Sequence, residues 1–237
     1  LNGIVQAMRF LKRQNQVISE NFGEVKELNS KNKNVIVIGG GDTGSDCIGT
    51  SNRQGAKSVL NFEILPKPSK QRTDENPWPY WPFTLKTSSS HQEGSKRQWS
   101  ILTKEFIDDG NGNVKALKTV EIEWIKKSNE RPRLVEIEGS EKIWPCDLVL
   151  LALGFTGPDK EIINDLKLSS DNTSKPLTNK YQTSDKKVFA AGDLRRGQSL
   201  IVWAISEGRE AAYEIDKFLM GSTELTSKVH GDLPSVK

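Results

Sequence analysis

The residues best suited to chemistry follow the apolar run at residues 35–38. Three glycines there have the spacing G-x-G-x-x-G, after residues that favour a buried strand and before a predicted helix. In such a unit the glycines allow a tight turn, close backbone approach to a pyrophosphate, and close packing of helix on strand. The N–H groups at the start of the helix attract the anion. The candidate dinucleotide-binding residues are Gly39, Gly41, Asp42, Thr43 and Gly44.

An acidic residue at the end of the next predicted strand strengthens this interpretation. Glu63 ends the strand predicted at residues 58–63, where a carboxylate accepts hydrogen bonds from the adenosine ribose and repels a 2′-phosphate. Glu63 therefore predicts NADH rather than NADPH. Lys67, Lys70 and Arg72 follow closely; they either accommodate a phosphate or form a solvated loop face. The alternative to dinucleotide binding is a unit that keeps the fold without the ligand.

Composition narrows the class of protein. The 237 residues suit one large domain or two modest ones, and the net charge is only +3 without a basic block, so nucleic acid is not an expected partner. No apolar run reaches the roughly 18–20 residues that a membrane span needs. Cys47 and Cys146 lie in apolar surroundings without C-x-x-C spacing, so two buried thiols are expected rather than a metal site or a disulfide.

The beginning of the chain predicts its origin. Leu-Asn-Gly-Ile contains neither an initiator methionine nor the pattern of a signal peptide. We therefore expect an excised piece of a longer protein from a reducing compartment, either the cytoplasm or an organelle.

The first half contains one long segment that is hard to assign. Helical spacing is expected at residues 4–13, a polar connector at 15–33, and the helix after the glycines at 43–54. Residues 66–99 are rich in proline and tryptophan, and proline lacks the N–H that a helix or an inner strand requires. Such a long loop is predicted to cover the domain or an adjacent subunit, with ligand contact as the alternative.

The second half favours strands. Residues 114–125 and 133–137 alternate in polarity, with a turn at 111–113, which predicts an antiparallel excursion. Residues 146–154 form a further apolar run that ends in glycine, and residues 155–187 are expected to be irregular.

A second apolar run, at residues 188–193, ends in Gly192 and Asp193. The Asp193 carboxylate can accept hydrogen bonds from a ribityl hydroxyl or from water near a pyrophosphate. A turn and then a helix are expected over residues 198–209, where small residues allow close approach of a ligand. A capping aspartate is the alternative, so spacing alone leaves flavin binding open. Arg195 and Arg196 either neutralise a flavin, pair with Asp193, or line a surface facing another part of the protein.

Four stretches together resemble a known family. They are VIVIGGGDTGSDCIGTSNRQGAKSVLNFEILP, NPWPYWP, IEGSEKIWPCDLVLLALGFTGP and VFAAGDLRRGQSLIVWAISEGREAA. They are similar to the C-terminal part of the eukaryotic-type NADH-dependent glutamate synthases, the portion equivalent to the bacterial small subunit. The resemblance covers roughly residues 1–220, and the Pro–Trp loop and the Gly-Asp-x-Arg-Arg-Gly-Gln-Ser-Leu stretch are more specific than a general Rossmann pattern.

The resemblance implies an α/β flavoprotein fold with two dinucleotide-binding domains, in which a Rossmann-like NAD domain is inserted into a partial FAD domain. Residues 34–153 would be the pyridine-nucleotide (NADH)-binding domain. Residues 1–33 would be a helix and connector of the FAD domain, and residues 154–237 its C-terminal part. The implied partner is the remainder of glutamate synthase, in the same chain or in another subunit.

The resemblance also implies a reaction and its cofactors. NADH passes hydride to FAD, and electrons cross iron–sulfur clusters to FMN, where glutamine and 2-oxoglutarate yield glutamate. Gly192 and Asp193 match the family's FAD-binding Gly-Asp motif, although Leu194 stands where many relatives have cysteine. The chain lacks a first G-x-G-x-x-G for FAD and clustered cysteines, so the iron–sulfur clusters and FMN belong to the missing remainder. Positions expected near the isoalloxazine ring are Gln198, Ser199, Leu200 and Val202.

Hydride transfer needs positioning rather than a general acid or base, so no catalytic side chain is nominated. His91 and His230, the only histidines, are expected to be solvated bystanders. Two alternatives remain open. One is another FAD/NAD(P) oxidoreductase, similar to dihydropyrimidine dehydrogenase or ferredoxin–NADP reductase, and the other is a non-catalytic nucleotide-binding fragment.

Overall fold

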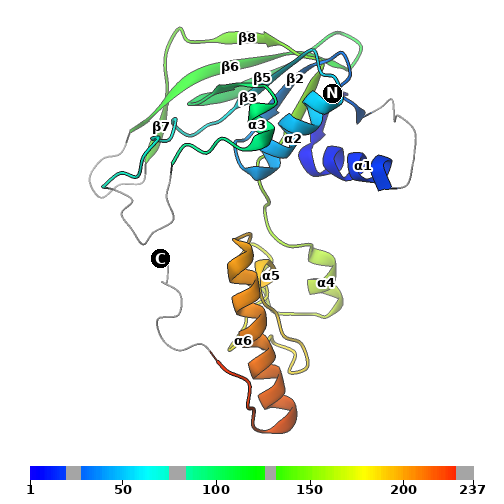
Figure 1. The fold of residues 1–237 in the computed structure, drawn as a ribbon, viewed down its shortest axis with the longest axis vertical. Helices are drawn as coiled ribbons and strands as arrows, with labels where there is room; N and C mark the ends of the chain where they lie inside the picture. The colour runs from blue at the N-terminus through cyan, green and yellow to red at the C-terminus, as the bar shows by residue number, and fades with distance from the viewer. Residues whose placement is uncertain (20–27, 75–83, 126–131, 228–237) are drawn as a thin grey trace. The chain divides into compact units, whose positions relative to one another are not determined.

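The apolar run after Asn34 forms the middle strand of a five-stranded parallel sheet (Figure 1). The computed structural model describes residues 1–19, 28–74, 84–125 and 132–227, and the chain divides into unit 1, Leu1–Gly154, and unit 2, Phe155–Lys237. The sheet belongs to unit 1 and has the strand order β1-β9-β2-β3-β4. The bounds are Ile4–Gln6 for β1, Asn34–Ile38 for β2, Ser58–Phe62 for β3, Lys96–Gln98 for β4 and Leu148–Leu151 for β9.

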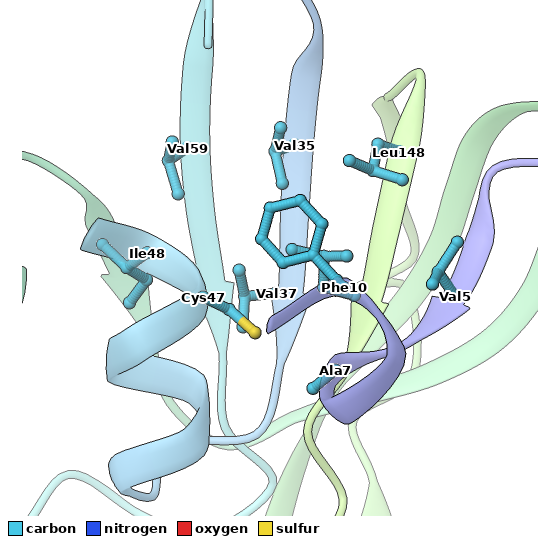
Figure 2. Packing of buried hydrophobic residues seen from close by; sticks show 10 residues of the cluster. Val5, Ala7, Phe10, Val35, Val37, Cys47, Ile48, Val59 and Leu148 are labelled. Carbon is cyan, nitrogen blue, oxygen red and sulfur yellow. The ribbon is translucent and has the colours of Figure 1, made fainter. Parts of the chain in front are cut away.

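One face of the parallel sheet is covered by two helices, α1 (Ala7–Ser19) and α2 (Asp42–Arg53). The predicted helix after the glycines is thus confirmed within one residue at each end. Figure 2 shows the ring of Phe10 from α1 among side chains of β2, β9 and α2. Phe10 is completely buried, so α1 contributes directly to this core.

The other face packs against an antiparallel sheet formed by β5 (Ile101–Asp108), β6 (Val114–Ile125), β7 (Arg133–Glu136) and β8 (Lys142–Pro145). β6 pairs with each of the other three strands. Ile36 and Val149 of the parallel sheet share a core cluster with Leu117 of β6. The antiparallel excursion predicted from the alternating pattern is therefore confirmed, and it closes the second face of the parallel sheet.

The first residues of the chain pack differently from what was expected. Ile4–Gln6 form a strand rather than the start of a helix, because they pair in parallel with β9, with Val5 opposite Leu150. Residues 1–19 consequently lie in unit 1, with the sheet that contains the glycine turn. The assignment of residues 1–33 and 154–237 to one FAD domain stays a prediction. The structure divides the chain after Gly154, one residue beyond the expected boundary.

The end of the proline- and tryptophan-rich stretch is regular, contrary to expectation. α3 (Ser89–Gln92) is a short helix, and β4 adds a strand to the parallel sheet by pairing with β3. The sequence Lys96–Gln98 is polar, so nothing in its pattern predicted a strand; the exposed edge of β3 supplies its hydrogen bonds. The proline motif at residues 76–82 lies outside the described residues, so its covering role stays a prediction.

The described part of unit 2 contains three helices, α4 (Lys160–Asp165), α5 (Asp193–Arg196) and α6 (Ile201–Met220). α4 lies in the segment expected to be irregular, and the Asp159 side chain caps its start by accepting from the Glu161 N–H at 3.0 Å. The strand expected at residues 188–193 is wrong: these residues form only an isolated bridge, between Phe189 and Gln182. The apolar run has no extended neighbouring strand within the described part of unit 2.

Both cysteines are buried free thiols, as expected. Burial, reinforced by a neighbouring aspartate in each case, raises the pKa of Cys47 and of Cys146 to about 12, so neither is a reactive thiolate. Among the residues that the structure describes, no helix combines the length and apolar character required to cross a membrane.

Replacement of Phe10 by alanine tests whether α1 is part of the unit 1 core. The ring is fully buried, so we expect Phe10→Ala to lower the free energy of unfolding by about 3–5 kcal/mol. Met8 is half exposed on the same helix, and Met8→Ala should change the free energy of unfolding by less than about 0.5 kcal/mol. Urea unfolding of the purified chain measures both; similar small losses would show that α1 does not contribute to the core.

Candidate functional site

The glycine turn between β2 and α2 is constrained by the backbone packed around it. Gly39 has φ +113°, and a Cβ on it would lie 2.2 Å from the Ala152 carbonyl oxygen. A Cβ on Gly44 would lie 2.2 Å from the Gly39 carbonyl oxygen. Both positions therefore exclude any side chain, and they hold α2 tightly against the ends of β2 and β9.

Gly41 differs from these two glycines. Apart from Gly41 itself and its two chain neighbours, no atom of the described residues lies within 4 Å of a Cβ built on Gly41. Its backbone is extended, with φ −76° and ψ −175°. Gly41 precedes α2, whose first residues are Asp42 and Thr43. The N–H groups of this first turn lack intrahelical acceptors, so the open side of Gly41 gives an anion access to them.

A cavity of about 460 Å³ opens over this turn, and we call it the glycine-loop cavity. Its wall includes the turn itself, the end of β3, and residues from the segment that leads into β4. Gly39, Gly41 and Asp42 line it together with Glu63, while Gly44 lies behind the turn and packs it. The predicted glycines and the predicted acid are thus brought to one place.

Glu63 follows β3 directly, and its carboxyl group lies over Gly40: a Cβ on Gly40 would be 1.9 Å from the Glu63 carboxyl carbon. The carboxylate is also paired, since Arg97 Nη2 lies 2.9 Å from Glu63 Oε1 and both side chains are largely buried. Neither Gly40 nor Arg97 was predicted as a site residue from the sequence. A third successive glycine was a visible signal for Gly40, whereas Arg97 is brought to the site only by the pairing of β4 with β3.

Lys67, one of three cations considered as phosphate ligands, lies with its Nζ 4.9 Å from the centroid of the Trp99 ring. The Arg97 guanidinium lies at the same distance from that ring. Lys70 and Arg72 are exposed. Arg97 contacts the acid at the end of β3 through its ion pair with Glu63.

His91 is not a solvated bystander, so that expectation is wrong. Its Nδ1 lies 2.8 Å from Ser88 Oγ and 3.4 Å from Ser45 Oγ, which links α3 to the first turns of α2. His91 lines the glycine-loop cavity. Burial lowers the pKa of His91, the nearby Arg97 charge lowers it further, and Glu63 opposes them, which favours the neutral ring at pH 7. His230 lies outside the described residues.

The second predicted site, in unit 2, is built around the turn that begins at Gly192. Gly192 has φ +65°, and Asp193 is the first residue of α5. Asp193 Oδ1 accepts from the Ser199 backbone N–H at 3.2 Å and lies 3.1 Å from Ser199 Oγ. Asp193 therefore closes the loop that contains Gln198 and leads into α6. Leu200 and Val202, at the start of α6, are both close to half exposed.

Glu207 of α6 fixes the position of the turn that begins at Gly192. It is 1% exposed, and its Oε2 accepts from the Gly192 N–H at 2.9 Å and from Arg195 Nε at 3.0 Å. Its Oε1 accepts from Arg196 Nε at 2.9 Å. Arg195 and Arg196 thus pair with Glu207, and the alternative that they pair with Asp193 is wrong. The sequence pattern indicated only the small residues of this helix and did not reveal Glu207, because a buried glutamate in a helix has no distinctive spacing.

Each arginine is also stacked on an aromatic ring. Arg195 lies 4.7 Å from the centroid of Tyr181, and Arg196 lies 4.4 Å from the centroid of Trp203. These contacts orient both guanidinium groups toward the buried carboxylate.

Comparisons with known proteins show which proteins this chain is similar to. A family model described as pyridine nucleotide-disulphide oxidoreductase matches residues 95–208. The chain is 47% identical to glutamate synthase [NADH] of Schizosaccharomyces pombe, over 94% of this chain and 11% of the relative. It is 42% identical to the glutamate synthase [NADPH] small chain of Bacillus subtilis, over 94% of this chain and 47% of the relative.

The chain is homologous to a segment of glutamate synthase. The resemblance identified from the four sequence stretches is therefore confirmed. The chain spans about half the length of the bacterial small chain and about a tenth of the fission-yeast protein.

A solved structure of Mycobacterium tuberculosis FprA in complex with NADPH matches with a TM-score of 0.66. The match covers 93% of this chain and 60% of FprA, at 13% identity, so it is a likeness of fold. Together with the family model, it confirms the predicted α/β fold of flavoproteins with two dinucleotide-binding domains.

Removal of the Glu207 charge should destabilise the protein in a pH-dependent way. Burial alone would raise the pKa of Glu207, but hydrogen bonds and charge from Arg195, with the Gly192 N–H and Arg196, hold it below its ordinary value. A depressed folded-state pKa contributes stability above the unfolded carboxyl value of about 4.3, and this contribution is lost as pH falls below it. Glu207→Gln should therefore lose about 2 kcal/mol at pH 7 and show a shallower decline on acidification.

Urea unfolding between pH 7 and pH 3 measures this difference. Glu224 is exposed near the end of the described residues, and Glu224→Gln is the control that should follow the parent profile. A Glu207→Gln curve parallel to the parent curve at all pH values would contradict the role assigned to this carboxylate.

Proposed function

We propose that this chain binds NADH at the glycine-loop cavity and passes hydride to an FAD held in part by unit 2, as a segment of glutamate synthase. The similarity to glutamate synthases over 94% of the chain supports the assignment. The single structural observation that carries it is the open face of Gly41 at the start of α2, beside a carboxylate at the end of β3.

The cavity brings together groups that suit the pyrophosphate and the adenosine ribose of NADH. The pyrophosphate lies against Gly41 and the first N–H groups of α2, from Asp42 and Thr43 onward, where the helix dipole stabilises its charge. The Glu63 carboxylate accepts hydrogen bonds from the adenosine ribose, and its charge disfavours a 2′-phosphate. NADH is therefore the proposed nucleotide.

The loop at the start of α6 fits one end of an FAD. The Gly192–Asp193 turn is held in place by Glu207 and Ser199, so it offers a positioned backbone and carboxylate to a ribityl chain. Exposed apolar surface at Leu200 and Val202 suits a planar ring. Bound FAD supplies the acceptor for hydride and a store for two electrons. The chain's own contribution is to bind and orient it through Gly192, Asp193, Gln198, Ser199, Leu200 and Val202.

The remainder of the synthase completes the reaction in this proposal. Among the described residues no group of three or more histidine, cysteine, aspartate or glutamate side chains could hold a metal. The iron–sulfur clusters, the FMN and the sites for glutamine and 2-oxoglutarate are assigned to the rest of the protein, in the same chain or a partner subunit. Two buried thiols suit a reducing compartment, cytoplasmic or organellar.

Calorimetric titration with NADH tests the proposed nucleotide site. Gly41→Ala places a methyl group on the open face of the turn, where its extended backbone accepts alanine, and should weaken NADH binding by at least about tenfold, or 1.4 kcal/mol. The free energy of unfolding should stay unchanged. Gly44→Ala should instead cost about 1–3 kcal/mol of stability, because its Cβ meets the Gly39 carbonyl oxygen.

Equal NADH affinity in the parent and Gly41→Ala chains would contradict a pyrophosphate site at this turn. Flavin absorbance of the full protein separates an electron-transfer segment from a non-catalytic nucleotide-binding fragment. Retained flavin that is bleached by NADH supports the proposed hydride transfer, and NADH binding without flavin reduction contradicts it.

A further inference from the structure

We propose that Arg97 is the residue that binds the 2′-phosphate of NADPH in this chain, and that its ion pair with Glu63 sets the preference between the two nucleotides. The inference rests on the proposed function, because it assigns the specificity of the same cavity. It goes beyond that function by giving the site a second, competing mode in which a cation, rather than the acid, meets the ribose.

The strand register places the two side chains at one sheet edge. β3 and β4 are parallel neighbours with Asn61 opposite Arg97, and the Glu63 N–H donates to the Gln98 carbonyl oxygen at 2.9 Å. The carboxyl ends of parallel strands meet at the same edge, so Glu63 and Arg97 reach the glycine-loop cavity together. The ion pair between them lies where an adenosine ribose meets the acid.

Arg97 keeps its position through contacts other than the one with Glu63. Its Nη1 donates to the Lys86 carbonyl oxygen at 2.8 Å, and its guanidinium stacks on the Trp99 ring. Arg97 Nε is buried and has no hydrogen-bond partner among the described residues. A guanidinium held by a carbonyl oxygen and an aromatic ring, with its Nε–H unused, is suited to a phosphate, which accepts two parallel N–H bonds.

The Glu63–Arg97 ion pair therefore affects the binding of NADH and of NADPH in opposite directions. With NADH bound, Glu63 accepts from the ribose hydroxyls while Arg97 stays paired and partly neutralises it. With NADPH bound, the phosphate competes with the Glu63 carboxylate for Arg97 and is repelled by that carboxylate. Removing the Glu63 charge releases the guanidinium and removes the repulsion, so both effects favour NADPH. Lys67 on the same Trp99 ring adds a second positive charge nearby.

A substitution at Gly40 is an independent way to change the preference between NADH and NADPH. Its Cβ position coincides with the Glu63 carboxyl group, so Gly40→Ala displaces that carboxyl and leaves both charged residues in the sequence. Because only the end of a flexible side chain must move, the turn itself keeps its packing. Gly40→Ala should shift the preference in the same direction as removal of the Glu63 charge.

Titration of the full chain with NADH and, separately, with NADPH tests the inference. Glu63→Gln should tighten NADPH binding by about tenfold or more and weaken NADH binding severalfold. Adding Arg97→Gln to that variant should abolish the gain for NADPH and change NADH affinity less than about twofold. The double variant avoids an unpaired buried carboxylate, and urea unfolding checks that each variant is folded. Arg53→Gln, which breaks a surface pair with Glu93, is the matched control and should alter neither affinity.

The outcomes separate this inference from the proposed function. A parent chain that binds neither nucleotide overturns both. If the chain binds NADH through Gly41, and Arg97→Gln leaves the NADPH affinity of the Glu63→Gln variant unchanged, only the role of Arg97 is overturned. Tighter NADPH binding by the Gly40→Ala chain, which disappears when Arg97→Gln is added, supports the role of Arg97. Glu63 is still present in both of these variants.

Discussion

The close approach of three backbone segments at the glycine turn is the constraint on which the rest of unit 1 depends. Gly44 of α2 packs on the Gly39 carbonyl, and Gly39 packs on the Ala152 carbonyl beyond β9. These contacts bring the start of α2 to the carboxyl ends of two strands. With any larger residue at Gly39 or Gly44 the helix would move away from the sheet, and its first N–H groups would no longer line the cavity.

The charged residues of the cavity are placed by the sheet rather than by the turn. β4 pairs with β3 beyond a long segment, and this pairing carries Arg97 to the Glu63 carboxylate. His91, Ser88 and Ser45 join the same wall through α3. The proline- and tryptophan-rich stretch thus ends in residues that shape the proposed nucleotide site.

In unit 2 the candidate turn is held in place by a buried ion cluster, whereas in unit 1 it is held by the close packing of glycines. The Glu207 carboxylate satisfies the Gly192 N–H and two guanidinium groups, so the turn before α5 is held by charge-assisted hydrogen bonds. Ile201 and Ile205 of α6 are more than half exposed, so much of the apolar surface near the proposed flavin loop is uncovered within the described residues.

Several features were determined by the sequence itself. The apolar run, the glycine spacing and the acid at Glu63 are local patterns, because a buried strand, a tight turn and a helix start each depend on residues close together in the chain. The antiparallel excursion was predicted from its alternation, and the four family stretches identified the relatives. The two buried thiols followed from their apolar neighbours.

Only the tertiary structure decided the pairings between distant residues. The strand at Ile4–Gln6 exists because β9 offers it a parallel edge, and the polar strand at Lys96–Gln98 exists because β3 does so on the other side. The partners of Glu63, His91, Arg195 and Arg196 came from segments that their own local sequence does not reveal. Hydrogen bonds and ion pairs of this kind depend on which groups the packed core brings within reach, and side-chain chemistry alone does not select among the many carboxylates and cations of the chain.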